Sequence, residues 1–440
     1  MANQQLDYKF LPTSRGGRYL VVEGFVFRLN RRRNDASWAS WRCQEKTCAA
    51  TVSTVNDIIT KHPSPHNHGP VHNEIKVRET LDRMKMVAKS SLGPIPTLYN
   101  EVLASVSDGP WTEENRSFIA EMPTYDTVKN RLYQARRSTF PPIPSSRREI
   151  VIPDEFKTTN AGEPFVIIND GDDDKILGMT TTVNMQHLCA AEVVYGDGTF
   201  YVSPSLFLQL YTLHAMVGGQ MFPLVFFLLP DKATVTYDRA FRLLKEAVEA
   251  RGLQMSPQHI QMDFESAAKN AVSVNFPTTL WRGCLFHYFC GRRHKGLAFR
   301  VDDVWLNALA DMPDDPRCLR LADYVTTQWV EGHIPQTAWN HYQNTGPRTN
   351  NHLEGWHGRL KKIISKAHPN VFEMLSFLRK EQKLNEIKLV QYAAGRKPPP
   401  KRRKYIHVNS RLETLKQELR DGAMSVMVYA DAVSHLMKLQ

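Results

Sequence analysis

The sequence lacks long apolar runs and an apolar segment near its start, and it has few cysteines. No stretch of its 440 residues approaches the roughly 18 consecutive apolar residues of a transmembrane helix, so we expect no membrane partner. The opening, MANQQLDYKF, has no apolar core of a secretory signal. We therefore expect an intracellular chain, in which six cysteines would not form a disulfide framework.

Acidic residues are too few to balance the basic ones. Lys and Arg number 56 and Asp and Glu 45, which gives a net charge of +11. Such an excess favours a polyanionic partner, although a solvated basic surface would give the same count. The length and a hydrophobic fraction of 42% predict two or three globular domains.

Changes in composition divide the chain into four parts. Residues 1–72 are aromatic and basic with short strand-like pieces, and residues 73–150 hold helices and a linker rich in Pro, Ser and Arg. Residues 151–390 alternate strand and helix patterns, and about 290–345 is a helical, Trp-bearing stretch. Residues 391–440 are a basic linker and further helices.

The first part carries a zinc pattern made of Cys43, Cys48, His66 and His68. C-x4-C suits a Cys2His2 site. H-x-H is tighter than the usual spacing, but it works in an extended segment because residues i and i+2 point the same way. A domain this small needs a metal to fold. His62 is a weaker fourth-ligand candidate.

These residues resemble a FLYWCH-type zinc finger over roughly residues 10–70. The matching landmarks come in order: Gly24-Phe25-Val26-Phe27, Trp41-Arg42-Cys43, Cys48-Ala49-Ala50 and His66-Asn67-His68. The resemblance implies DNA or protein binding. We place phosphate contacts at Arg31, Arg32 and Arg33, with a solvated hairpin tip as the alternative.

Three acids stand out by their place in the strand order. Asp197 interrupts the strand pattern VVYGDGTFYV at 193–202, Asp263 ends the strand HIQMD, and Glu354 lies in the first turn of a later helix. The order of elements is that of an RNase H-like α/β fold: three strands, a helix, a strand ending in an acid, a helix, a strand and a helix. There the first and fourth strands are neighbours, so Asp197 and Asp263 should meet.

Three converging carboxylates suit Mg²⁺ or Mn²⁺, which bind through oxygen. A pair of such ions activates the attacking oxygen and stabilises the leaving one in phosphodiester cleavage. Each acid also has an ordinary interpretation: Asp197 as a turn residue, Asp263 as a strand end and Glu354 as an acid at a helix N-terminus. Glu265, on the same strand face as Asp263, is a rival third ligand.

The same region is similar to Mutator-like element (MULE) transposases over about residues 75–390. The motifs are Tyr195-Gly196-Asp197-Gly198-Thr199-Phe200, Met262-Asp263-Phe264-Glu265, Cys284-Leu285-Phe286-His287 and Asn350-Asn351-His352-Leu353-Glu354-Gly355-Trp356-His357. The resemblance implies a DDE triad, here Asp197, Asp263 and Glu354. The 91 residues from Asp263 to Glu354 (354 − 263) leave room for the all-helical insertion of such transposases.

A second group of Cys and His follows in CLFHYFCGRRH: Cys284, His287, Cys290 and His294. A C-x-x-H pair recurs beside the active site in similar families, which implies that Cys284 and His287 support the site or contact DNA. Core packing and a second zinc site remain alternatives. Three cations that suit a phosphate backbone lie beside this group: Arg292, Arg293 and Lys295.

Two further basic segments complete the interpretation. The predicted helix 124–137 carries Lys129, Arg131, Arg136 and Arg137, and suits a helical, helix-turn-helix-like DNA-binding segment or a solvated helix. PPPKRRKY at 398–405 is typical of a nuclear localisation signal.

We therefore expect a nuclear DNA transposase that binds double-stranded transposon ends as a homo-oligomer, with structural zinc and catalytic Mg²⁺ or Mn²⁺. The alternative is a non-catalytic DNA-binding transcriptional regulator derived from such an enzyme. A metallonuclease for RNA shares the fold, but it gives the finger and the insertion no evident role.

Overall fold

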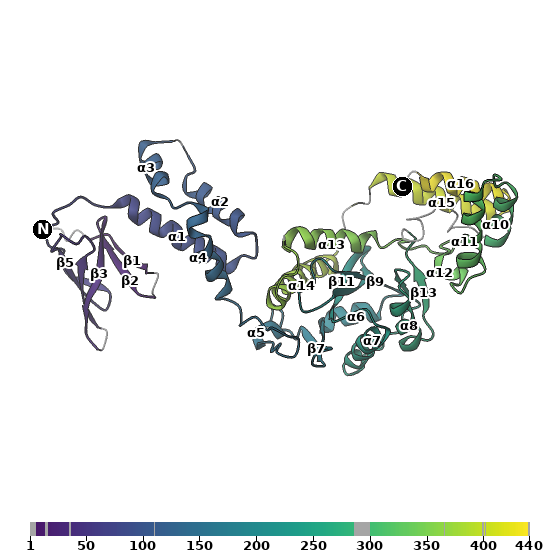
Figure 1. Ribbon diagram of the computed structural model, residues 1–440, viewed down its shortest axis with the longest axis horizontal. Coiled ribbons are helices and arrows are strands. Elements are labelled where there is room, and N and C mark those ends of the chain that lie inside the picture. Colours follow the sequence, from purple (N-terminus) through teal and green to yellow (C-terminus); the bar gives the residue numbers. More distant parts are fainter. Residues whose placement is uncertain are drawn as a thin grey trace. The chain divides into compact units, whose positions relative to one another are not determined.

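The structure is a computed structural model that describes residues 6–13, 16–34, 37–109, 111–285, 300–364, 366–397, 400 and 402–438. The chain forms two compact units, Met1–Pro141 and Pro142–Gln440 (Figure 1). Among the described residues, no helix has both the length and the apolar character needed to cross a membrane.

The first unit begins with an antiparallel sheet of six strands in sequential order. Alternate residues of these strands face one apolar cluster that includes Leu20, Phe27, Trp41 and Val52, as expected for a sheet that is buried on one side. The strands are β1 Tyr8–Pro12, β2 Arg18–Val22, β3 Phe25–Arg32, β4 Trp38–Cys43, β5 Thr51–Val55 and β6 Ile58–Lys61.

Four helices follow, α1 His72–Ser90, α2 Ile95–Val106, α3 Glu113–Glu121 and α4 Tyr125–Arg137. Apolar residues at helical spacing gather in a cluster around Phe118 and Leu132. The sheet packs on α1 through an apolar cluster that contains Leu11 and Ile75. Lys9 Nζ and Glu79 Oε1 pair at 2.6 Å beside it, so the sheet and the helices form one packed body.

The second unit is built on a mixed sheet in the order β13-β12-β9-β10-β11-β8-β7. β12 is parallel to β9 and β13, and the other pairs are antiparallel. β9 and β12, the first and fourth strands of the predicted order, are neighbours as predicted. The strands are β7 Val166–Asp170, β8 Ile176–Met179, β9 Val193–Thr199, β10 Gln209–Val217, β11 Gln220–Leu229, β12 His259–Met262 and β13 Leu280–Gly283.

Helices cover both faces of this sheet (Figure 1). α7 and α8 contribute Tyr237, Phe241 and Ala271 to the main core on one face. On the other face, the Trp356 ring of α13 lies 5.8 Å from the Phe226 ring. The helices of the core are α5 Asp154–Lys157, α6 Thr182–Cys189, α7 Thr234–Glu249, α8 Ser266–Asn275, α13 Asn351–Ile364 and α14 Val371–Ala393.

Where it is described, the stretch between β13 and α13 holds short helices up to Trp339, joined by turns, and residues 340–350 form no helix. The C-terminal helices pack on it through an apolar cluster that joins Val304, Trp339 and Ala430. Composition predicted a separate C-terminal part at residues 391–440, but its helices pack on the helices between β13 and α13. These elements are α10 Val301–Ala310, α11 Pro316–Val325, the π-helix η1 Thr326–Val330, α12 Gln336–Trp339, α15 Arg403–Arg420 and α16 Val426–Lys438.

One predicted strand is shorter than expected. The apolar pattern predicted a strand over 193–202, but β9 ends at Thr199. Phe200 and Tyr201 leave the sheet because the chain turns there, with Ser203 N–H donating to Phe200 O at 3.1 Å. Both rings end up exposed, although strand-forming aromatics predict burial in a sheet.

A buried histidine beside β13 makes the second unit sensitive to acid. His341 Nε2–H donates to Gly283 O at 2.8 Å, and its Nδ1 accepts from the Asn344 amide at 3.0 Å. Burial lowers the pKa of His341 from 6.5 to about 3. The unfolded chain binds the proton more tightly, so stability is complete above pH 6.5 and is lost as the pH falls toward 3.

We expect protonation of His341 in the unfolded chain to lower the free energy of unfolding of this unit by about 2 kcal/mol when the pH falls from 7 to 5. Denaturant unfolding at the two pH values measures it. In His341→Gln, whose amide can both donate and accept, the pH-dependent loss should shrink by that amount. An unchanged loss in this variant would show that His341 is not the titrating group.

Candidate metal centre and active site

In the first unit, the donor atoms of two cysteines and two histidines lie within 4.8 Å of one another: Cys43, Cys48, His66 and His68. Among the described residues, no other group of His, Cys, Asp or Glu could hold a metal ion in this way. Cys43 Sγ lies 3.2 Å from His68 Nε2, and Cys48 Sγ lies 3.4 Å from His66 Nδ1. A tetrahedral zinc ion separates such ligands by about 3.3–3.6 Å. The donor set therefore fits structural zinc.

The surroundings prepare these side chains as ligands. His68 Nδ1–H donates to Gly69 O at 2.8 Å, which leaves Nε2 free to coordinate. Burial, and then His68, lowers the pKa of His66, so its ring is neutral. Phe25 stacks on that ring with centroids 3.7 Å apart. The two histidines use different nitrogens, which is how the short H-x-H spacing is accommodated. His62 is exposed and lies outside the group.

The predicted cations of the finger lie on its surface. Arg31, Arg32 and Arg33 are exposed at the end of β3. Sequence reasoning missed Arg28 and Arg42, which are paired in register across β3 and β4 and are both exposed. Like charges directly opposite each other are unfavourable, and a bound phosphate between them would relieve that cost. The sequence did show Arg28 and Arg42, one in each of the two predicted strand segments, and this pair of basic residues could have been taken as a second cationic site.

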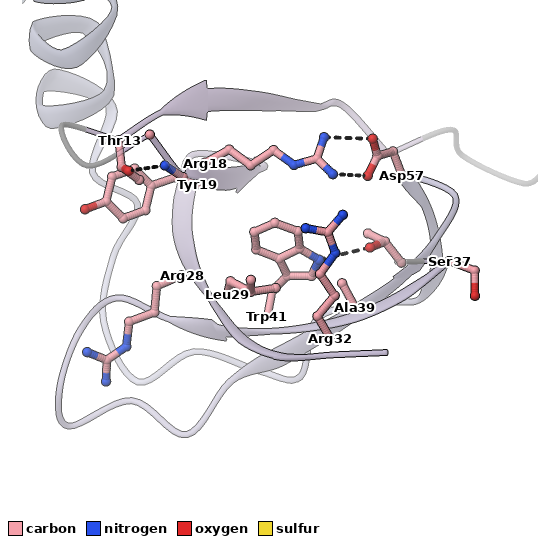
Figure 2. Close-up of a pocket in the computed structure, with 13 residues that line it drawn as sticks. Thr13, Arg18, Tyr19, Arg28, Leu29, Arg32, Ser37, Ala39, Trp41 and Asp57 are labelled. Atoms are coloured by element: carbon pink, nitrogen blue, oxygen red, sulfur yellow. Dashed lines mark hydrogen bonds and ion pairs between the residues drawn. The ribbon is translucent and has the colours of Figure 1, made fainter. Parts of the chain in front are cut away.

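A hollow of about 670 Å³ opens beside these cations on the finger sheet (Figure 2). Arg18 donates to both carboxylate oxygens of Asp57 at 2.7 and 2.6 Å along one side of it. Arg28 and Arg32 also line it, with Trp41. The hollow adds cationic surface to the finger.

In the second unit, strand register aligns two of the predicted acids. β9 and β12 pair His259 with Val193 and Gln261 with Tyr195, an offset of 66 residues (259 − 193). Asp263 and Asp197 differ by the same 66 residues (263 − 197). The parallel register therefore places Asp263 opposite Asp197, just beyond the end of β12.

Asp197 and Asp263 line one small pocket of about 70 Å³. Glu265 lines it too, and Glu354 is not among the described residues that do so. Two further oxygens of the lining, Tyr211 Oη and Gln209 Oε1, are buried without a hydrogen-bond partner in the described part of the chain. Carboxylate, hydroxyl and amide oxygens are the donors that hard cations prefer, so the donor set fits Mg²⁺ or Mn²⁺.

Glu354 lies on the face of α13 that turns toward these acids. Asn350, four residues before it, donates to Asp263 Oδ1 at 3.1 Å. His357, three residues after it, places Nδ1 3.2 Å from Asp197 Oδ2. Residues at i, i+4 and i+7 share one helix face, so Glu354 lies between two residues that contact the two aspartates.

Behind Asp197 runs a buried chain of polar side chains that the sequence did not reveal. Thr212 Oγ1 lies 3.4 Å from His357 Nε2 and 2.9 Å from His214 Nε2. Burial, and then His357 and His352, holds the pKa of His214 well below its usual value, so this ring is neutral. Asp197 Oδ1 accepts from Gly198 N–H at 2.8 Å. The chain and the strand thus fix the carboxylate at both oxygens.

Gly196 and Gly198, beside Asp197, make room for polar side chains of β10. A Cβ at Gly196 would lie 2.5 Å from Tyr211 Oη, and one at Gly198 would lie 2.5 Å from Gln209 Oε1. The two glycines thus admit the two unpartnered oxygens of the pocket.

We expect Gly196→Ala to destabilise the second unit by about 1–3 kcal/mol, because the new methyl group overlaps the Tyr211 hydroxyl. Tyr211→Phe removes that hydroxyl and leaves the nearest ring carbon at 3.3 Å. The double variant should recover most of the loss in a denaturant double-mutant cycle. Strictly additive effects would contradict the overlap.

Cys284 contacts the same site from behind. It is buried, and its Sγ accepts from Asn350 N–H at 3.2 Å. It therefore supports the residue that bonds Asp263. The other members of its predicted group and the neighbouring cations lie outside the described residues: His287, Cys290, Arg292, Arg293, His294 and Lys295.

The predicted cations of α4 have different environments. Arg131 and Arg137 are exposed, and Lys129 pairs with Asp126 at 2.8 Å. Arg136 turns inward and donates to Ala88 O at 3.2 Å in the last turn of α1 and to Gly93 O at 2.6 Å in the loop that follows. Arg136 thus satisfies a helix terminus, whereas Arg131 and Arg137 remain available to a partner.

Comparison with known protein families agrees with these two centres. Residues 10–68 match the FLYWCH zinc finger domain, and residues 193–290 match the MULE transposase domain. The resemblance that the sequence motifs indicated is therefore confirmed. No curated protein matches the chain.

Proposed function

Because the chain joins a FLYWCH zinc finger domain to a MULE transposase domain, we propose that it is a DNA transposase. It would bind transposon-end DNA and carry out metal-dependent strand cleavage and strand transfer on an RNase H-like core. The observation that carries the proposal is the register of β9 and β12, which sets Asp197 against Asp263 in one oxygen-lined pocket.

Asp197 and Asp263 would hold Mg²⁺ or Mn²⁺ with Glu354 as the third carboxylate. The metal, when bound, supplies Lewis-acid chemistry at phosphate oxygens. Asn350 and His357 orient the two aspartates through the contacts given above. Positioning of this kind raises the rate because the carboxylates need no rearrangement when substrate arrives.

The remaining parts of the chain would supply DNA contacts and a nuclear localisation signal. The exposed arginines of the finger suit phosphates, as do Arg131 and Arg137 of α4. The basic residues Arg402, Arg403 and Lys404 are exposed at the start of α15 and support a nuclear localisation signal. Two copies on paired DNA ends would fit a reaction that joins them.

A second candidate is a non-catalytic DNA-binding regulator derived from a transposase. One observation favours it: both carboxylate oxygens of Asp197 already have partners in the protein, Gly198 N–H and His357. The zinc finger and the basic surfaces would serve that function unchanged.

An assay with overlapping short duplexes that cover the DNA flanking the coding region distinguishes the transposase from the regulator. The full chain, incubated with Mg²⁺ or Mn²⁺, should nick one set of these duplexes at defined positions and bind the same duplexes tightly without metal. Tight binding with no cleavage of any duplex in either metal would overturn the enzyme and leave the regulator.

A further inference from the structure

Two exposed aromatic rings lie directly after the strand that bears Asp197. Phe200 and Tyr201 are each 41% exposed, and Phe200 lines the same pocket as Asp197 and Asp263. Isolated exposed apolar residues are ordinary on protein surfaces. Two exposed rings at adjacent positions, one of them lining an acidic pocket, call for a partner with flat apolar faces.

Each ring has a lysine ammonium group over it. Lys232 Nζ lies 4.2 Å from the Phe200 centroid, and Lys361 Nζ lies 4.3 Å from the Tyr201 centroid, within cation–π range. Lys361 extends the α13 face of Glu354 and His357, since it follows His357 by four residues. Lys232 Nζ also lies 3.8 Å from Glu265 Oε2. Among the described residues Lys361 forms no ion pair, so Lys361 supplies the available charge.

The backbone that carries the rings is fixed in place. Val202 and Phe207, on either side of the turn, are buried. His368 N–H donates to Tyr201 O and Ser203 N–H donates to Phe200 O, both at 3.1 Å. Ser203 Oγ–H donates to Phe207 O, also at 3.1 Å. Exposed rings on a pinned loop lose little conformational entropy when a planar ligand stacks on them.

We propose that Phe200 and Tyr201, with Lys232 and Lys361, form a stacking platform for unpaired nucleotides of a DNA strand. The inference rests on the proposed function, because it names the form of substrate at the same pocket. Stacking on aromatic rings with cations for the phosphates is how single strands are bound without sequence preference. A paired base hides its faces within the duplex, so the platform selects nucleotides that have left the stack.

An acidic peptide is the other partner that lysines would attract. It has no flat faces for the two rings, and Asp197, Asp263 and Glu265 in the adjoining pocket would repel its carboxylates. Phosphates meet the same acids, but the metal that we propose for this pocket would neutralise them. The chemistry of the platform therefore favours a nucleic acid.

The test compares a blunt duplex with the same duplex carrying a three-nucleotide single-stranded end that contains 2-aminopurine. The full chain with Asp197→Asn, in Ca²⁺ in place of Mg²⁺, keeps cleavage out of the measurement while a divalent cation can still neutralise the remaining acids of the pocket. We expect tighter binding of the overhang duplex and quenching of 2-aminopurine. Phe200→Leu with Tyr201→Leu should lower the overhang-to-blunt affinity ratio by about 5- to 100-fold and remove the quenching.

Two matched variants keep the result specific. Tyr201→Phe retains the ring and should preserve the ratio, as should Trp111→Leu, which removes an exposed ring from the other unit. An unchanged ratio in the double leucine variant, or equal competition by poly-glutamate and a single-stranded oligonucleotide, would overturn the platform. Overhang preference without cleavage in the wild-type chain would refute the transposase and leave the platform standing.

Discussion

Cys43→Ser is expected to remove zinc from the chain and unfold the finger. The Cys43 thiol is buried beside Cys48 in the core of the six-stranded sheet, so its loss takes away both a ligand and a core side chain. We expect about one zinc ion per wild-type chain by atomic emission, and a zinc affinity more than about 100-fold weaker in the variant. Amide exchange over β3–β5 should become fast.

Three further variants test whether the loss of zinc is specific to the four proposed ligands. Cys189→Ser changes a half-buried cysteine in the other unit, and His62→Ala changes an exposed histidine of the finger; both should keep full zinc. His66→Ala should lose it as Cys43→Ser does. If Cys43→Ser retained one zinc ion per chain, the cluster of Cys43, Cys48, His66 and His68 would not be the zinc site. A second zinc ion in the wild type would indicate a further site in the group at Cys284.

The sequence predicted what depends on local pattern and strand order. Apolar periodicity located the strands and helices of the core, and the order of elements made neighbours of β9 and β12. That adjacency predicted that Asp197 and Asp263 lie near each other, and the observed register of β9 and β12 places them opposite each other. The Cys and His spacing predicted the finger ligands because a tetrahedral cage admits few spacings.

The rest depends on contacts between distant residues, which no local pattern encodes. His357 meets Asp197 across 160 positions (357 − 197), and Thr212 reaches His357 only because α13 packs on β10. The same reason hid the inward turn of Arg136, whose partners are carbonyl groups in the last turn of α1 and in the loop after it. Phe200 and Tyr201 were predicted in a strand because their side chains favour one, while the turn at Ser203 ended it.

The larger expected effect is on cleavage: Asp197→Asn and Asp263→Asn should each reduce metal-dependent strand cleavage by about 10³-fold or more. Each change replaces a carboxylate that we propose as a metal ligand by a neutral amide of the same shape, and a bound metal ion contributes several kcal/mol to phosphoryl-transfer transition states. Neither side chain belongs to the exposed arginine surfaces, so affinity for duplex DNA in EDTA should stay within about twofold. Gel assays of cleavage and binding on one duplex measure both.

The third carboxylate is decided by the same assay. Glu354 lies on the α13 face between Asn350 and His357, whereas Glu265 lines the pocket directly. Glu265, however, already accepts from Tyr237 Oη–H at 3.2 Å and lies 3.8 Å from Lys232 Nζ, so it is committed within the protein. We therefore expect Glu354→Gln to match the aspartate variants and Glu265→Gln to lose less than about tenfold. The reverse order would make Glu265 the third ligand and give α13 a purely positioning role, because Asn350, just before the helix, and His357 would still hold the two aspartates.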